Sequence, residues 1–184
     1  MADLLEVTDL HTQFFTRDGV VRAVDGVTFQ VAAGETLGIV GESGCGKSVT
    51  ALSLMRLIPQ PPGKIVKGSI MFDGQDLAKL GEPEKRKLWG KRLAYVAQSA
   101  AASFNPAHRL IDQYSETPTW HGVMNGEEAK RNAVDLYRRL RLPNPETIGN
   151  RYPHQVSGGQ LQRMLLARIF FLRPEVLVAD EPPR

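Results

Sequence analysis

The chain has 184 residues, 42% of them hydrophobic, and a formal net charge of +3. This length and composition suffice for one domain with a sizeable core, and they exclude a disordered tail. Because the positive charge is small and not uniformly spread, it gives no reason to expect a nucleic acid as the partner.

The first third of the chain alternates apolar runs with turn residues. Strands are predicted at Leu4–Leu10 and Val20–Val31, and a short apolar run at Thr36–Val40 is typical of a buried parallel strand. A glycine-rich loop at residues 41–46 follows. The next stretch, Lys47–Ile58, lacks Gly and Pro and favours a helix, which the following prolines end.

The rest of the chain continues this alternation of strands and helices. The predicted elements, in order, are a strand at Gly68–Phe72 closed by a turn at Asp73-Gly74, a helix at Glu82–Lys91, a strand at Leu93–Ala97, a helical insert from Ser99 to about Tyr152 with its clearest helix at Glu127–Leu140, a helix at Gln160–Phe171 and a strand at Val176–Ala179. The order predicts an α/β fold with a parallel sheet. Ligands bind such sheets at the carboxyl ends of the strands, where both Gly41 and Asp180 fall.

The glycine-rich loop matches the phosphate-binding pattern G-x-x-x-x-G-K-[ST] without exception. Glycines let backbone N–H groups turn toward an anion, and the following helix adds its N-terminal N–H groups. We expect Lys47 to contact the β- and γ-phosphates of ATP and Ser48 to bind Mg²⁺. The predicted nucleotide-binding residues here are Gly41, Glu42, Ser43, Gly44, Cys45, Gly46, Lys47, Ser48 and Val49.

The strand at Val176–Ala179 ends in two acids, Asp180 and Glu181. Such a pair alone is often a solvated turn, but a phosphate loop upstream changes its meaning. We expect Asp180 to hold Mg²⁺, directly or through water, and Glu181 to act as the general base that polarises the attacking water.

A third motif, Val156-Ser157-Gly158-Gly159-Gln160, lies between the loop and the acidic strand. It resembles the signature motif L-S-G-G-Q of the ABC ATPases, with Val156 in place of Leu. A hydroxyl and bare N–H groups at a helix start make a second phosphate-binding surface. The resemblance implies a dimer with two ATP molecules at its interface, in which Ser157, Gly158, Gly159 and Gln160 of one subunit meet the phosphate loop of the other.

The same resemblance assigns further residues and the fold. Gln98, after the Leu93–Ala97 strand, takes the place of the family's Q-loop glutamine, which senses the γ-phosphate and the metal. Phe14 takes the place of the aromatic that stacks on adenine, with Phe15 as a competitor and a core phenylalanine as the alternative. The implied fold is a P-loop NTPase (RecA-like) core with N-terminal antiparallel strands and a helical ABC insert.

Flanking segments are similar to those of dipeptide and oligopeptide importer ATPases, and the nickel importers look alike. These segments are residues 19–27, 68–74, 103–106 and 152–155. The resemblance implies two transmembrane permease subunits, a second ATP-binding subunit and a periplasmic solute-binding protein as partners, and no nucleic acid. It places the chain on the cytoplasmic face of the inner membrane as a peripheral protein.

Other sequence features agree with a peripheral location. The single cysteine, Cys45, cannot form an internal disulfide, so a reducing compartment is the default. Residues 1–9 carry acids and lack the basic start of a signal peptide. The apolar stretch Met164–Leu172 is interrupted by Arg168 and is far too short to span a bilayer.

We divide the chain into residues 1–98 (N-terminal strands and P-loop core), 99–155 (helical subdomain) and 156–184 (signature helix and acidic strand). Pro183 and Arg184 depart from the family pattern, which continues with further strands and a switch histidine. We therefore expect a chain truncated after the Walker B motif, at Asp180-Glu181, of marginal stability. The alternative function is a fragment that at most binds nucleotide. A DNA-repair or translation ATPase is disfavoured because its long inserts are not present.

Overall fold

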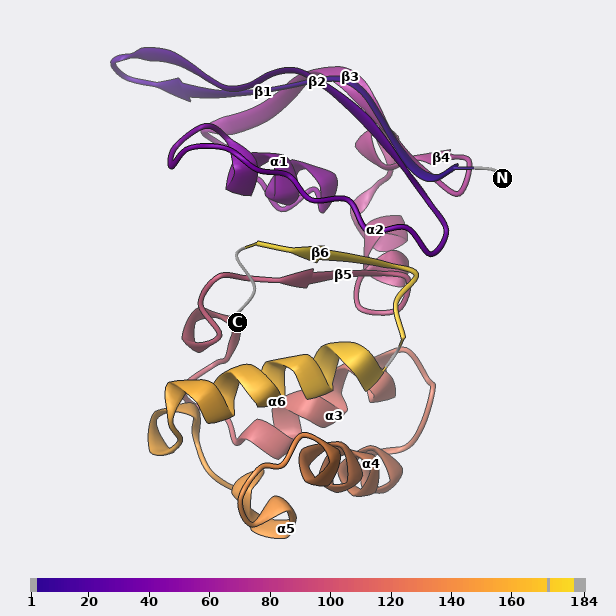
Figure 1. Ribbon diagram of the computed structural model, residues 1–184, viewed down its shortest axis with the longest axis vertical. Coiled ribbons are helices and arrows are strands. Elements are labelled where there is room, and N and C mark those ends of the chain that lie inside the picture. The colour runs from indigo at the N-terminus through magenta and orange to yellow at the C-terminus, as the bar shows by residue number, and fades with distance from the viewer. Residues whose placement is uncertain (1–2, 172, 181–184) are drawn as a thin grey trace. The chain divides into compact units, whose positions relative to one another are not determined.

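A computed structural model describes residues 3–171 and 173–180 of the chain. It divides the chain into two compact units, residues 1–86 and 87–184, which are described separately (Figure 1). Across the described residues, no helix has both the length and the apolar character that crossing a membrane requires.

The first unit is built on an antiparallel sheet (Figure 1). A long hairpin of β1 (Asp3–Thr16) and β2 (Gly19–Ala32) is extended by β3 (Gly63–Phe72) and the short β4 (Gln75–Asp76), in the order β2-β1-β3-β4. The three strands predicted here are confirmed, and each is longer in the structure than the range predicted from the sequence. Asp73 and the following glycine form the predicted turn, with φ values of 47° and 75° that suit a two-residue hairpin loop.

An irregularity in the β1 ladder is held by charged side chains. Asp9 has φ 48°, and the two ring nitrogens of His11 lie 2.8 Å from carboxylate oxygens of Asp9 and Asp25. Lys67 on β3 forms an ion pair with Asp9 at 2.7 Å. Gly68 faces the same place, where an added Cβ would lie 2.6 Å from the carbonyl oxygen of Thr8, so only glycine fits without a shift.

One face of this sheet packs on α1 (Lys47–Leu54), as Figure 1 shows. Leu10, Ile70 and Phe72 are completely buried, and apolar burial of this kind is the main stabilising contribution to a small unit. A 3₁₀ turn, η1 (Leu77–Lys79), completes the unit's core, and α2 (Glu82–Leu88) continues into the second unit.

Two predictions for this region are wrong in detail. Residues 36–40 form no strand within the described part, because no described segment pairs with their backbone, and Leu37, Ile39 and Val40 are exposed. The predicted helix 47–58 ends at Leu54. There Arg56, with φ 55°, takes the position usually held by glycine, and the N–H of Leu57 bonds the carbonyl of Leu52 at 2.8 Å, which is a Schellman-type helix end.

The second unit pairs β5 (Leu93–Val96) with β6 (Val176–Ala179) in parallel. These strands match the predicted ones, and their parallel pairing agrees with the predicted α/β class. An ion pair between Arg92 and Glu175, at 2.5 Å, precedes both strands.

Helices form the rest of the second unit (Figure 1). They are α3 (Leu110–Trp120), α4 (Gly126–Arg139), α5 (Pro145–Ile148) and α6 (Gly158–Phe171), with 3₁₀ turns η2 (Ala101–Ser103) and η3 (Pro153–Gln155). Tyr114, Tyr137 and Met164 are almost fully buried at their centre, and the two tyrosine rings meet edge to face with centroids 6.0 Å apart. Asn125 and Glu128 form a capping box that starts α4. The predicted helical insert is thereby confirmed.

Candidate functional site

The phosphate loop occupies residues 41–46 and leads directly into α1. Gly44 and Gly46 have φ values of 82° and 97°, a region that glycine adopts readily and other residues rarely. A Cβ at Gly46 would collide with the carbonyl oxygen of Ala23 on β2. Position 46 is therefore glycine for two reasons, its left-handed dihedral angles and the close approach of its backbone to β2.

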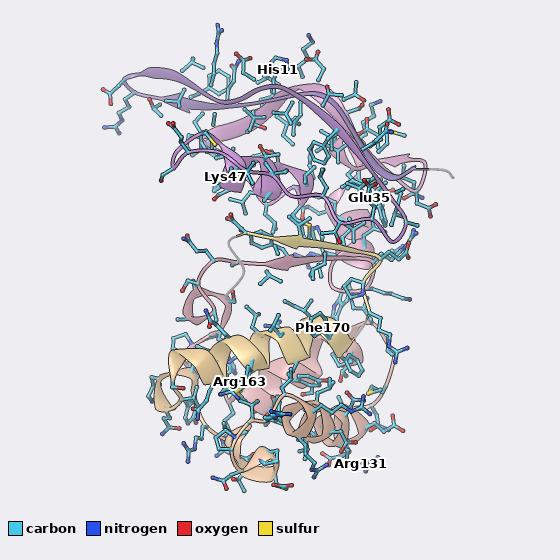
Figure 2. All side chains as sticks on the ribbon, viewed as in Figure 1. His11, Glu35, Lys47, Arg131, Arg163 and Phe170 are labelled. Atoms are coloured by element: carbon cyan, nitrogen blue, oxygen red, sulfur yellow. The ribbon has the colours of Figure 1, made fainter. Side chains whose placement is uncertain are left out.

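Lys47 holds the two sides of the loop together. Its Nζ donates hydrogen bonds to the carbonyl oxygens of Gly41, at 2.9 Å, and Glu42, at 2.7 Å, and Figure 2 shows it beside the loop at the start of α1. The loop thus presents an ammonium group together with the N-terminal N–H groups of a helix. This donor set fits a polyphosphate, because every group in it favours negative charge.

Both candidate adenine-stacking residues lie near the end of β1. Phe14 is partly buried, and a Cβ at Gly63 would lie 3.0 Å from its Cε1 atom, so its ring packs over that glycine. Phe15 is 50% exposed. Phe14 and the phosphate loop belong to the same unit of the structure.

The acidic strand end lies in the other unit. Tyr95 on β5 donates a hydrogen bond from its hydroxyl to the Asp180 carboxylate, at 3.2 Å. Burial, and then the nearby Asp180 charge and this bond, raise the pKa of Tyr95 to about 12. Gln98 is exposed two residues beyond β5. Glu181, the predicted general base, lies outside the described residues.

Sequence reasoning did not single out Tyr95. In the sequence, Tyr95 is only a tyrosine in the middle of a predicted strand. The pairing of β5 with β6 is needed to show that its hydroxyl reaches Asp180. A neutral donor orients this carboxylate without adding a competing charge, which suits a residue predicted to bind a metal ion.

The Ser-Gly-Gly-Gln motif begins α6 as a reciprocal cap. The N–H of Gln160 donates to the Ser157 hydroxyl at 3.3 Å, and the Gln160 side-chain oxygen accepts from the Ser157 N–H at 2.9 Å. Since the Ser157 hydroxyl accepts in this bond, it keeps its own hydrogen for another acceptor. Gly158 and Gly159 are exposed beside it, so the start of α6 offers donors to an anion.

Arg163 ties this helix start to the end of α4. Its guanidinium donates to the carbonyl oxygens of Gly159, at 3.3 Å, and Arg141, at 2.9 Å, and Figure 2 labels it on α6. These bonds connect the start of α6 to the segment that follows α4.

The predicted metal ligands are distributed over both units. Ser48 lies in the first turn of α1, whereas Gln98 and Asp180 belong to the second unit. A hydroxyl and a single carboxylate suit Mg²⁺, which usually keeps several waters and takes further oxygens from a bound phosphate. The donor types fit the ion, and the assignment of these three residues stays a prediction.

Comparison with known proteins gives consistent matches. The model of the family described as "ABC transporter" matches residues 24–184. A probable peptide ABC transporter ATP-binding protein of Sinorhizobium fredii is 45% identical over 97% of this chain and 53% of its own length. The oligopeptide transport ATP-binding protein OppD of Bacillus subtilis is 44% identical over 97% of this chain and 50% of its own length. The chain thus spans about half the length of these relatives.

A solved structure supports the fold. A dimeric ATP-binding cassette in a post-hydrolysis state, bound to ADP and Pi, superposes with a TM-score of 0.83 at 24% identity, over 97% of this chain and 74% of that one. The predicted fold class is confirmed by this likeness, since it includes the antiparallel N-terminal sheet, the parallel strands and the helical insert.

Proposed function

The chain belongs to the ABC transporter family, and from this we propose that it is the ATP-binding part of a subunit that powers peptide import. Di- or oligopeptides would cross the bacterial inner membrane at the expense of ATP hydrolysis. The observation that carries the nucleotide assignment is the phosphate loop, in which the Lys47 ammonium group lies within hydrogen-bond distance of the Gly41 and Glu42 carbonyl oxygens. The peptide assignment is supported by relatives described as peptide and oligopeptide transport proteins.

In this proposal the first unit binds the nucleotide. Residues 41–46 and the first turn of α1 donate N–H groups to the phosphates, Lys47 neutralises the β- and γ-phosphates, and Phe14 stacks on adenine. Ser48, Gln98 and Asp180 would hold Mg²⁺, which would supply positive charge at the phosphate oxygens. Glu181 accepts a proton from the attacking water.

The partners follow from the same proposal. Ser157, Gly158, Gly159 and Gln160 contact the ATP held by a second ATP-binding subunit, so two nucleotides close the dimer. Two permease subunits carry the peptide through the membrane, and a periplasmic binding protein delivers it. The chain sits as a peripheral protein on the cytoplasmic face of the membrane.

The first test is a thermal melt with and without Mg-ATP. At about 100 times its dissociation constant, a ligand stabilises the folded chain by about 2.7 kcal/mol. We expect this shift for the unmodified chain and for Lys64→Ala, an exposed lysine on β3, and its loss in Lys47→Ala. A shift that survives in Lys47→Ala would refute the assignment of the loop.

Substrate identity needs a cellular test. We expect deletion of the gene to abolish uptake of a radiolabelled tripeptide and to leave nickel uptake unchanged. The reverse pattern would overturn peptide import in favour of a metal importer and leave the nucleotide assignment intact.

A further inference from the structure

Two fully buried hydroxyl groups join the sheet of the first unit to α1. Thr12 on β1 and Ser53 on α1 have no exposed surface, and their side-chain oxygens are 2.8 Å apart. Ser53 donates its only hydroxyl hydrogen to the carbonyl oxygen of Val49, at 2.7 Å. Thr12 must therefore donate to Ser53, and the order of donation is Thr12 to Ser53 to Val49.

The two ends of this relay lie close to the two ends of the candidate nucleotide site. Val49 belongs to the first turn of α1, which also carries Lys47 and follows the phosphate loop. Thr12 precedes Phe14 by two residues on β1. The relay thus connects the strand that carries the candidate adenine platform with the helical turn that carries the phosphate-binding lysine.

Apolar contacts alone would not fix the position of α1 so closely. Buried apolar residues flank both hydroxyl groups in the sequence, Leu10 before Thr12 and Leu54 and Met55 after Ser53, and apolar attraction is non-directional. A helix held only in this way can rotate or slide with little loss of contact. A buried hydrogen bond is directional and costly to leave unsatisfied, so it selects one position.

We propose that Thr12 and Ser53 are positioning residues of the nucleotide site, and that their relay sets the distance between the adenine platform and the phosphate loop. The inference rests on the proposed function and assigns a role to two residues that touch no phosphate. A ligand that spans both ends of the site depends on this distance. A ligand that occupies only the loop does not.

Calorimetric binding of Mg-ATP and of Mg-tripolyphosphate to the full chain separates these cases. Thr12→Val keeps the side-chain shape and removes the donor. We expect it to weaken ATP binding by about tenfold, the effect of one well-placed hydrogen bond, and to leave tripolyphosphate binding unchanged. Thr12→Ser restores the donor and should restore ATP affinity. Thr8→Val removes an exposed hydroxyl from the same strand and should change neither.

Any other outcome of these binding measurements would count against the inference or against the proposed function. Equal weakening of both ligands, unchanged ATP affinity, or no rescue by Thr12→Ser would overturn the inference. If Thr12→Val gives no cooperative melt, Ser53→Ala replaces it, and failure of both variants to fold would show a purely structural role. If the unmodified chain binds neither ligand, the proposed function itself fails.

Discussion

Alanine at Gly46 should be far more damaging than alanine at Gly44, although both are glycines of the same loop with positive φ. In either position alanine must adopt a left-handed conformation, at about 1–2 kcal/mol. The reduced entropy of the unfolded chain offsets about 0.4–1 kcal/mol of this. A Cβ at Gly44 has nothing within 4 Å, so Gly44→Ala should destabilise the chain by only about 1 kcal/mol.

Gly46→Ala adds a collision with the Ala23 carbonyl oxygen, a backbone atom that cannot rotate away. Overpacking of this kind costs about 1–3 kcal/mol, which brings the total to about 2–4 kcal/mol. A chain of this length loses roughly 2–4 °C in melting temperature per kcal/mol. We therefore expect a drop of about 2–4 °C for Gly44→Ala and about 4–16 °C for Gly46→Ala.

Thermal melts followed by circular dichroism, with and without Mg-ATP, measure both effects. If the loop relieves the collision by moving, the Gly46 variant should also lose its ATP-dependent stabilisation. Equal drops in melting temperature for the two variants would refute the reasoning, because they would show that the approach to Ala23 contributes nothing.

Three further predictions concern other parts of the candidate site. Cys45 is exposed and is the only cysteine, so Mg-ATP should slow its maleimide labelling, measured by mass spectrometry, and an unchanged rate would argue against a ligand over the loop. Burial and the nearby Asp180 raise the pKa of Tyr95 in the folded chain from its ordinary value near 10 to about 12, so stability should fall as the pH rises through this window and fall less in Tyr95→Phe. Denaturant titrations that show the same loss in both chains would contradict the raised pKa of Tyr95. Ser157→Ala removes the cap of α6 and should cost about 1 kcal/mol in chemical denaturation, whereas Ser157→Asp should keep most of it, since Asp also accepts from the Gln160 N–H; equal losses would exclude the cap.

The sequence predicted those turns, helices and strands that are defined by a short local pattern of residues. The hairpin turn at Asp73-Gly74, the amphipathic α4 and the apolar β6 follow from turn chemistry and periodicity. The end of α1 was predicted too late. Arg56 adopts the left-handed conformation that ends the helix. The sequence does not predict this conformation, because arginine rarely adopts it.

Pairing across the chain was the least predictable property. Residues 36–40 have the apolar run of a buried strand, but a strand is defined by hydrogen bonds to neighbours, and the run itself does not say where the neighbours are. The relay through Thr12 and Ser53 was missed for the same reason. Both residues have ordinary surface-type side chains, and only the packing of α1 on β1 brings them together over 41 positions.

If the loop binds phosphate as proposed, the hydrogen bonds from Lys47 to the carbonyls of Gly41 and Glu42 make that binding an exchange. An arriving phosphate group competes with partners that the ammonium already has, so the net gain is the difference between two charge-assisted bonds. A phosphate chain too short to reach Nζ would leave the lysine on its carbonyls and draw no benefit from it. The proposed site would therefore favour phosphate chains long enough to reach Lys47 over shorter ones.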